Sequence, residues 1–388
     1  MAGAATEVPL AWRNLVADKP RLTRSASGIA FAIVLMLIEL GLRNGFIDSA
    51  VDIIRKLDGD IVITSSSKYQ FAKKAPFSRR QLYQARGVEG VASARPVYAE
   101  LTYSVWKNPD DHTSYAMQVF GLDPDQPVFL MPEVSAKLAE LRQPDTLMTD
   151  SRARSFVGRG GPGIKSEFAG TEVRIIGSFP LSPDFYTDGT LIMSDRNFLK
   201  LLGRFEQQPL DLPDPEIGVV KVLPGYEVHS VQKALRAALP SNVSVLTKAE
   251  LVDQETRYQS QISGVGPIFG AGALIGFAVG MIICYQILYT DIADQFAQYA
   301  TLKAIGYHNS YLVRVVLQQA VFYGFVGYLP AWAISVALYR LVAAVSLLPM
   351  HMTFGLTAVS LALTVGMCVI SGLMALRGVV RADPAEVF

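Results

Sequence analysis

The glycine-rich stretch "GRGGPGIKS", Gly158 to Ser166, has a spacing that imitates two nucleotide-binding motifs. Its first six residues fit G-x-G-x-x-G, which binds a dinucleotide only where a strand precedes it and a helix opens on its last glycine. Pro162 and the basic run "RARSFV" before it fit neither requirement. The stretch also fails as a phosphate-binding loop, because Ile164 separates Gly163 from Lys165. We therefore predict a mobile loop here and no nucleotide site.

Histidines and cysteines are few and scattered, and the chain contains neither H-E-x-x-H nor G-x-S-x-G. The four histidines are His112, His229, His308 and His351. Both cysteines, Cys284 and Cys368, lie inside long apolar runs, which disfavours a disulfide framework and a zinc site. We predict no catalytic residue, no metal site and no cofactor bound by this chain.

Glu39 is the one acid deep inside an apolar segment, and an ionisable residue in a membrane span is by default a candidate for function. Arg43 follows four residues later on the same helix face, near the outer end of the segment. An i,i+4 ion pair at the interface explains both residues. We favour this intramembrane pair over a role in binding substrate or moving a proton.

The composition indicates a protein that is partly embedded in a membrane. The chain has 388 residues, is 51% apolar and carries a formal charge of +1. Its mean hydropathy of +0.29 is high for a soluble protein and low for one that lies wholly in lipid. The near-zero charge gives no argument for nucleic acid as a partner.

Four segments are long and apolar enough to cross a bilayer, which takes roughly 20 residues. They lie at about 27–47, 264–289, 315–339 and 353–376. Lys and Arg concentrate before the first and after the last segment, so both termini are expected on the cytoplasmic side. The region between the first two spans then lies outside, which in a bacterium with two membranes is the periplasm.

The second span carries a row of glycines, which let helix backbones approach closely. Gly266 and Gly270 form one small-x-x-x-small pair, and Gly272, Gly276 and Gly280 form a longer row. The sequence leaves two interpretations open, namely packing within one chain and a seam between two copies.

The outer region shows the patterns of strands and helices, and helical spacing continues outward from the first span as a stalk. The predicted strands are "DIVIT", "VASARPVYAELTYSVW", "YAMQVFGL", "TEVRIIGSF", "TLIMS", "IGVVKVL" and "VSVL", and the predicted helices are "SRRQLYQAR" and "EVHSVQKALRAAL". Thr247 and Glu250 match a capping box at the start of a second stalk that leads back to the membrane. The fold class is thus an α-helical membrane protein with four transmembrane helices and a large extracytoplasmic α+β domain inserted between helices one and two.

The predicted organisation divides the chain into nine segments. They are a cytoplasmic amphipathic N-terminal helix (1–26), the first span and stalk (27–58), a periplasmic porter-like subdomain in two parts (59–122 and 216–247), a sabre-like insertion (123–215), the second stalk and span (248–289), a cytoplasmic coupling segment (290–314), the last two spans (315–376) and a cytoplasmic tail (377–388).

Three stretches resemble the FtsX-like permeases of the MacB type, a class of ABC transporter, and the DevC branch in particular. They are "PLAWRNLVADKPRLTRSASGIAFAIVLM" at the start, "QYATLKAIGYHNSYL" between the second and third spans, and "RADPAEVF" at the end. The resemblance extends over the whole chain, although the outer region matches in layout more than in motif.

The resemblance implies a non-catalytic permease in the bacterial inner membrane that works as a homodimer. Only about 26 residues precede the first span, so a separate cytoplasmic ATPase subunit is expected to use the ATP and Mg²⁺. Its contact on this chain is expected at Tyr299, Leu302, Lys303, Ala304, Ile305 and Gly306, with Arg381, Asp383, Pro384 and Glu386 beside it. The implied export route adds a periplasmic membrane-fusion adaptor and, indirectly, an outer-membrane TolC-like duct, for lipid-like, glycolipid-like or small hydrophobic compounds.

Two other functions fit the same four spans. One is a permease that releases lipoproteins from the inner membrane. The other is an FtsX-like transmitter that controls a cell-wall hydrolase. The sequence does not choose a substrate.

Overall fold

The computed structural model describes residues 19–158, 160–181, 187–202, 214–295 and 309–381. The chain forms two compact units. The helical unit comprises residues 1–44, 267–342 and 350–388, and the sheet unit comprises residues 45–266 and 343–349.

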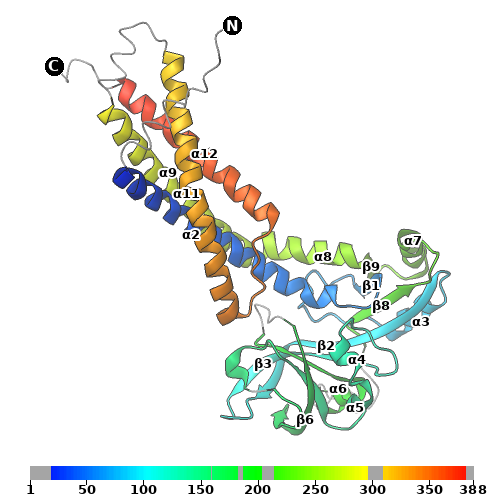
Figure 1. Cartoon of the computed structure of the whole chain (residues 1–388). Coiled ribbons are helices and arrows are strands. Elements are labelled where there is room, and N and C mark those ends of the chain that lie inside the picture. The colour runs from blue at the N-terminus through cyan, green and yellow to red at the C-terminus, as the bar shows by residue number, and fades with distance from the viewer. Residues whose placement is uncertain (1–18, 159, 182–186, 203–213, 296–308, 382–388) are drawn as a thin grey trace, which may run out of the picture. The chain divides into compact units, whose positions relative to one another are not determined.

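Four long helices make up the described part of the helical unit, and each contains a candidate membrane span (Figure 1). They are α2 (Lys19–Arg55), α9 (Val265–Asp294), α11 (Asn309–Ser346) and α12 (Phe354–Arg381). The four predicted spans are confirmed as helices of spanning length. Helix α2 runs unbroken from Lys19 to Arg55, which confirms the prediction that the helix of the first span continues as a stalk.

Polar side chains tie these apolar helices to one another. The Tyr339 hydroxyl of α11 donates to the carbonyl oxygen of Leu37 in α2. The Tyr328 hydroxyl donates to a carbonyl oxygen of α12 at 2.9 Å, and Ser371 of α12 donates to the carbonyl oxygen of Met281 in α9 at 2.8 Å. Lipid offers such groups no alternative partner, so these bonds help to fix which helix faces meet.

The sheet unit is built on nine strands in the order β3-β7-β4-β6-β5-β2-β8-β1-β9. The strands are β1 (Ile61–Ser65), β2 (Val91–Lys107), β3 (Ser114–Leu122), β4 (Thr146–Asp150), β5 (Lys165–Phe168), β6 (Thr171–Phe179), β7 (Thr190–Ser194), β8 (Ile217–Val222) and β9 (Val243–Thr247). All of them lie between α2 and α9 along the chain.

Six of the strands pair in a closed ring, because β2 also pairs with β3. Strand β2 belongs to both parts of the sheet. Its first half, from Val91 to Val97, pairs with β8, and its second half pairs with β3 and touches β5 at Trp106. A register shift between Glu100 and Ser104 interrupts the ladder with β3. Such an irregularity bends a strand, which lets β2 leave the flat part of the sheet and enter the ring.

Helices α3 (Arg79–Arg86) and α7 (Val228–Ala238) belong to the open part of the sheet, where they share one apolar core with β1, β8 and β9. The shorter helices are α4 (Pro132–Ser135), α5 (Leu138–Leu141), a 3-10 turn at Ser155–Val157 and α6 (Asp195–Leu202). Helix α8 (Lys248–Arg257) follows β9 and runs into a π-helical turn at Tyr258–Ile262, just before α9 begins.

The seven predicted strands and two predicted helices of this region are confirmed, as is the capping box of Thr247 and Glu250. Two strands were not predicted, β4 and β5. The structure joins the predicted porter-like and sabre-like parts in a single sheet, and their division into separate subdomains stays a prediction.

The described part of the glycine-rich stretch adopts a loop between the 3-10 turn and β5. Gly158 and Gly163 have φ angles of 98° and 90°, a region that glycine enters without strain. A strand rather than a helix follows Gly163, so the arrangement that a dinucleotide motif requires is not formed.

Candidate functional site

Most of the residues predicted to contact an ATPase lie outside the described residues. This applies to Tyr299, Leu302, Lys303, Ala304, Ile305, Gly306, Asp383, Pro384 and Glu386. Arg381 is the last residue of α12. What the structure does describe is the set of helix ends between which the segment 296–308 runs, the end of α9 and the start of α11.

A charged cluster joins three helices at these ends. Arg21, near the start of α2, forms ion pairs with Asp291 and with Asp294, the latter at 3.0 Å. The Tyr323 hydroxyl of α11 donates to the second carboxylate oxygen of Asp291 at 2.6 Å. We call Arg21, Asp291, Asp294 and Tyr323 the helix-end cluster.

The cluster has a clear physical reason. Asp291 is 5% exposed, and a buried carboxylate is stable only with charged or hydrogen-bonding partners. Both acids also lie in the last turn of α9, where the helix dipole disfavours negative charge and where α9 has no basic residue of its own. Arg21 from α2 supplies the missing charge, so that the start of α2 and the end of α9 are held together, and Tyr323 joins them to the first half of α11.

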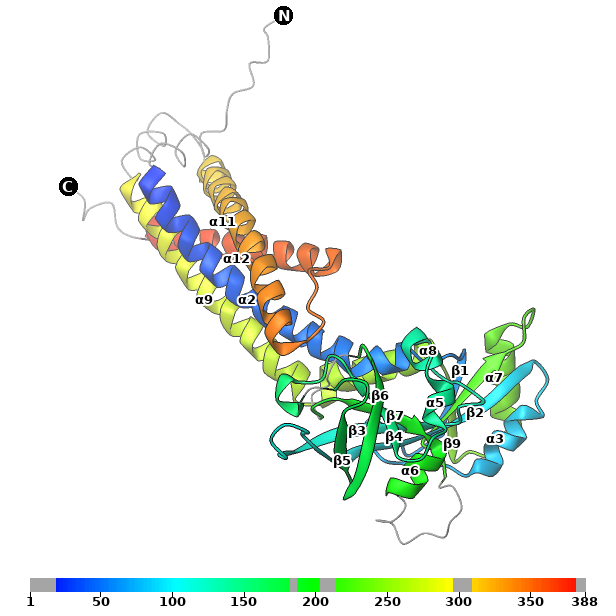
Figure 2. The same cartoon turned by 60° about the horizontal axis from the view of Figure 1, so that its bottom comes forward.

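The glycine row of α9 packs against other helices of the same chain. A Cβ on Gly276 would lie 3.3 Å from the backbone nitrogen of Met36 in α2. A Cβ on Gly280 would meet Ala32 of α2 and the Met367 sulfur of α12. In the structure these glycines therefore allow α2 and α9 to lie side by side, as Figure 2 shows.

The remaining glycines of α9 differ in what a side chain at their position would contact. A Cβ on Gly272 would lie 2.5 Å from a carboxylate oxygen of Glu39, and one on Gly266 would meet the backbone of Ser260. A Cβ on Gly270 would meet no atom within 4 Å. A seam between two copies at this end of α9 stays a prediction.

The expected ion pair between Glu39 and Arg43 is not formed in the structure, although both side chains are among the described residues. The half-buried carboxylate of Glu39 lies against Gly272 instead, where the missing side chain leaves room for it. Arg43 Nη1 lies 3.4 Å from Oδ1 of its neighbour Asn44. The i,i+4 spacing was correct, but tertiary packing against α9 decides where Glu39 points.

Cys284 of α9 and Cys368 of α12 lie close together as free thiols, with 3.3 Å between their sulfurs. Both are buried, at 1% and 0% exposure. The contact is another point at which α9 packs on α12.

Within the sheet unit, two other segments bond to the chain at the end of α2, namely the start of α8 and the loop at 128–130. The Lys248 side chain, at the start of α8, donates to the carbonyl oxygen of Leu57 at 3.0 Å. The backbone NH of Leu130 donates to the carbonyl oxygen of Lys56 at 2.7 Å, and that of Asp58 donates to the carbonyl oxygen of Val128 at 2.8 Å. The carbonyl groups that a helix leaves unpaired at its C-terminus thus find partners. We call this arrangement the α2 socket.

An ion-pair network supports the socket. Asp58 accepts a hydrogen bond from Lys221 of β8 at 2.9 Å and pairs with Arg95 of β2 at 3.3 Å. Burial raises the pKa of Asp58, but the bond from Lys221 and the charge of Arg95 outweigh it, so that the pKa lies below its ordinary value. The network anchors the helix to two adjacent strands of the sheet.

A second buried ion pair connects the loop after β1 to Glu216, the residue before β8. Lys68 and Glu216, 5% and 2% exposed, form an ion pair of 2.7 Å, and Glu216 also accepts the backbone NH of Ala75 at 3.0 Å. Burial lowers the pKa of Lys68, and the charge of Glu216 opposes that shift. The loop also reaches α8, because Glu255 accepts the backbone NH of Phe71 at 2.7 Å.

Asp150, at the end of β4, is the acid with the most perturbed pKa outside the spans. It is 4% exposed, and burial raises its pKa to about 7 even though Oδ1 accepts the backbone NH groups of Arg152 and Leu181. Its other oxygen has no hydrogen-bond partner among the described residues. A single buried carboxyl with no nucleophile or second acid bonded to it indicates a structural role.

No residue of the helix-end cluster or the socket was predicted as a site residue from the sequence. Arg21, Asp291 and Tyr323 lie far apart along the chain, so no spacing rule connects them. One signal was present, namely two acids at the end of an apolar run with no basic residue nearby. Among the described residues, no three His, Cys, Asp or Glu side chains are placed to hold a metal ion.

Comparison with known proteins gives one family. Residues 270–384 match the family described as FtsX-like permease C-terminal. The match begins within α9 and includes all of α11 and α12. No curated protein sequence matches this chain.

Two solved structures are similar over about half of the chain. The extracellular domain of the ABC-type transporter YknZ from Gram-positive bacteria is 12% identical, with a TM-score of 0.33 over 48% of this chain and 98% of that one. The periplasmic region of MacB from Actinobacillus actinomycetemcomitans is 10% identical, with a TM-score of 0.36 over 55% of this chain and 99% of that one. Both TM-scores are below 0.5, so these similarities carry no argument about this chain.

Proposed function

We propose that this chain is the permease subunit of an ABC transporter of the FtsX-like class, and that it transmits motion driven by ATP rather than catalysing a reaction. The observation that carries the proposal is the family match over residues 270–384, the part of the chain that contains α11 and α12. The four helices of spanning length agree with it.

The helix-end cluster supports a mechanical role. An ATPase that pushes on the segment 296–308 acts on both helices to which that segment is joined. The end of α9 is bound to α2 through Arg21 and to α11 through Tyr323. A push at this point therefore acts on three helices together, rather than bending one of them.

The α2 socket supports the second half of the mechanism. Helix α2 has 37 residues, which corresponds to about 55 Å at 1.5 Å per residue. Its far end is fixed to two strands through Asp58 and to the start of α8 through Lys248. A displacement of α2 along its axis is thereby transmitted to the sheet unit.

The remaining details of the proposal rest on resemblance to the MacB and DevC type. The chain acts as a homodimer in the bacterial inner membrane, with both termini in the cytoplasm and the sheet unit in the periplasm. A partner ATPase binds at Leu302 and Ile305 and uses ATP and Mg²⁺. The motion drives lipid-like or small hydrophobic envelope substrates through a periplasmic adaptor and a TolC-like duct.

Co-purification tests this function. The tagged full chain is isolated from membranes of its source cells, and its partners are identified by mass spectrometry. We expect an ABC ATPase, and a membrane-fusion adaptor with a TolC-like protein supports export. A cell-wall hydrolase in place of the adaptor supports the signalling transmitter, and a lipoprotein carrier supports lipoprotein release. Absence of any ABC ATPase from the wild-type complex contradicts the proposal.

A double substitution tests the coupling segment. Leu302→Asp with Ile305→Asp places two carboxylates where an apolar contact is proposed, so retention of the ATPase is expected to fall at least about tenfold, a change of 1.4 kcal/mol. Thr301→Asp is the matched control in the same segment and is expected to retain the ATPase. Equal retention by both variants shows that the coupling assignment is wrong.

A further inference from the structure

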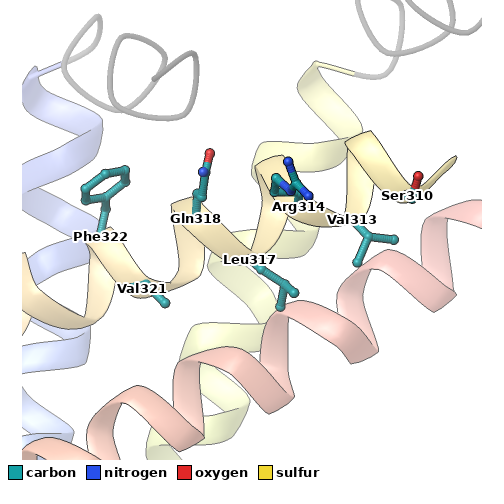
Figure 3. Close-up of a pocket in the computed structure, with 7 residues that line it drawn as sticks. All are labelled: Ser310, Val313, Arg314, Leu317, Gln318, Val321 and Phe322. Atoms are coloured by element: carbon teal, nitrogen blue, oxygen red, sulfur yellow. The ribbon is translucent and has the colours of Figure 1, made fainter. Parts of the chain in front are cut away.

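A groove runs along the first turns of α11, with a volume of about 460 Å³ (Figure 3). All the described residues that line it belong to this one helix. Its walls consist of two rows of side chains, each with the i,i+4 spacing that aligns residues along one helix face.

The two rows differ in chemistry. The apolar row is Val313, Leu317 and Val321. The other row, the polar row, begins with the polar residues Ser310, Arg314 and Gln318 and ends in the aromatic Phe322. Figure 3 shows Leu317 and Val321 pointing to one side of the helix and Gln318 to the other. A hydroxyl, a guanidinium and an amide can all donate hydrogen bonds, so the polar row is a line of donors beside an apolar strip.

The charge of the groove favours an anion. Its described lining contains one guanidinium and no carboxylate. Arg314 is exposed and forms no ion pair with any described residue. The neighbouring pocket at the ends of α2 and α9 is different, because there Asp291 and Asp294 offset the positive charge of Arg21.

The groove lies on the part of α11 where a lipid headgroup and the start of its acyl chain are expected. The uncharged apolar run of α11 begins at Val315 in the sequence, so Arg314 lies immediately before it and Val321 lies inside it. The apolar row from Val313 to Val321 is about 12 Å long at 1.5 Å per residue. At the edge of a bilayer, a phosphate lies beside the first methylenes of an acyl chain. Arg314 lies next to Val313 and about one turn before Leu317, so a phosphate at Arg314 places its acyl chain beside Leu317 and Val321.

We propose that this groove is a binding site for one anionic phospholipid. Arg314 pairs with the phosphate, Ser310 and Gln318 donate to the remaining oxygens of the headgroup and glycerol region, and the acyl chain lies along Val313, Leu317 and Val321. A guanidinium suits this task because it offers several donors to one phosphate. The site belongs to the helical unit alone and does not depend on the proposed function.

Native mass spectrometry of the purified full chain in detergent tests the site. The chain is titrated with phosphatidylglycerol and, separately, with phosphatidylcholine of the same acyl chains. We expect one phosphatidylglycerol to be retained in preference to phosphatidylcholine. Because a hydrogen bond between charged groups contributes about 1.5–3 kcal/mol, Arg314→Gln is expected to weaken retention at least about tenfold. Arg314→Lys keeps the charge and is expected to weaken it less.

Matched controls separate this site from general contact with lipid. Arg377→Gln removes another exposed arginine at the end of a span, and Leu341→Ala removes an exposed apolar side chain elsewhere on α11. Both are expected to change retention less than about twofold. Leu317→Ala shortens the apolar row and is expected to weaken retention about fivefold, which corresponds to lost contact with about one methylene at roughly 0.8 kcal/mol each.

Three results overturn the proposal. The first is equal retention of the two lipids by the wild type, and the second is an equal effect of Arg314→Gln and Arg377→Gln. The third is a loss of dimer in Arg314→Gln and Leu317→Ala with unchanged lipid retention, which assigns the groove to contact between copies. A photoactivatable phosphatidylglycerol on the wild-type chain provides a test that needs no variant, since its label is expected on residues 310–322.

Discussion

Lys248 and Leu57 are 191 residues apart in sequence, yet Lys248 Nζ lies 3.0 Å from the carbonyl oxygen of Leu57. Lys248 is the first residue of α8, and Leu57 follows the last turn of α2. One side chain thus joins the helix that enters the sheet unit to the helix that leads out of it. A cation at the C-terminal end of a helix is also favoured by the helix dipole.

We expect Lys248→Met to lower the stability of the sheet unit by about 1 kcal/mol, because the apolar part of the side chain remains while the bond to α2 is lost. Trp106 is buried in this unit, so its emission in a chain carrying Trp12→Phe and Trp332→Phe reports thermal unfolding of the unit in detergent. Lys233→Met changes an exposed lysine on α7 and is the matched control, with no expected change. Equal melting of the two variants contradicts a role for Lys248 in the socket.

Asp150 predicts a specific pH dependence. Its pKa rises from an ordinary value of 3.8 to about 7 in the fold because of burial, so the folded state favours the protonated carboxyl. Stability from this group is therefore greatest below pH 3.8, falls as the pH rises to about 7 and is constant above that. With about 1.36 kcal/mol for each pKa unit, the loss is on the order of 4 kcal/mol.

Asp150→Asn keeps an oxygen for the two backbone NH groups and removes the charge. We expect this variant to lack the decline between pH 4 and 7 and to melt above the wild type at pH 8, both followed by Trp106 emission. Asp58 does not interfere, because its lowered pKa confines its contribution to lower pH. Parallel pH profiles of the variant and the wild type contradict the assignment to Asp150.

The helix-end cluster predicts that the stability of the helical unit depends strongly on Arg21. Arg21→Gln leaves the buried carboxylate of Asp291 with Tyr323 as its hydrogen-bond donor, and the expected cost is about 3 kcal/mol. Adding Asp291→Asn to Arg21→Gln is expected to recover part of this loss, because the unpaired charge is then gone. Arg24→Gln, an exposed arginine on the same helix, is the control and is expected to cost less than about 0.5 kcal/mol. Additive effects of the two cluster substitutions, measured by melting of the helical unit through Trp332 emission, argue against the pair.

The glycine row gives a comparison within one helix. Gly276→Leu places a side chain against the backbone of α2 and is expected to destabilise the helical unit by about 1–3 kcal/mol. At Gly270 a Cβ meets no atom, so Gly270→Leu is expected to be neutral or to stabilise by up to about 1 kcal/mol through helix propensity. Light scattering of Gly270→Leu also tests the other interpretation of the row, because a loss of dimer in this variant places a seam between copies at that end of α9.

The elements that sequence reasoning located are those with a strong periodic pattern. The four spans are long apolar runs, and strands such as Ile217–Val222 combine β-branched residues with turn signals at both ends. Strand β4, "TLMTD", was missed because it has only two apolar residues, whereas the equally buried β7 has three in a row. Strand β5, "KSEF", has one apolar residue and no β-branched residue, so it carries no strand signal.

The partners of the charged residues could not be predicted from the sequence for a different reason. Glu39 was paired with Arg43 because both lie on one helix, where spacing alone decides which side chains can meet. In the structure Glu39 lies against Gly272 of α9, and Asp291 forms an ion pair with Arg21 of α2. Both acids, Glu39 and Asp291, thus contact a residue of another helix. Such choices depend on which helix faces pack together, and local sequence does not contain that information.

The close approach of α2 and α9 at Gly276 and Gly280 also restricts how this protein can change over evolutionary time. The opposite face of α9, with Ile268, Leu274 and Ile275 exposed, accepts any apolar side chain of similar size. The glycine face accepts almost none, because each replacement must be matched by a smaller residue on α2 or α12. The two helices are thus bound to vary together at these positions and independently elsewhere, a pattern of covariation that related sequences will display.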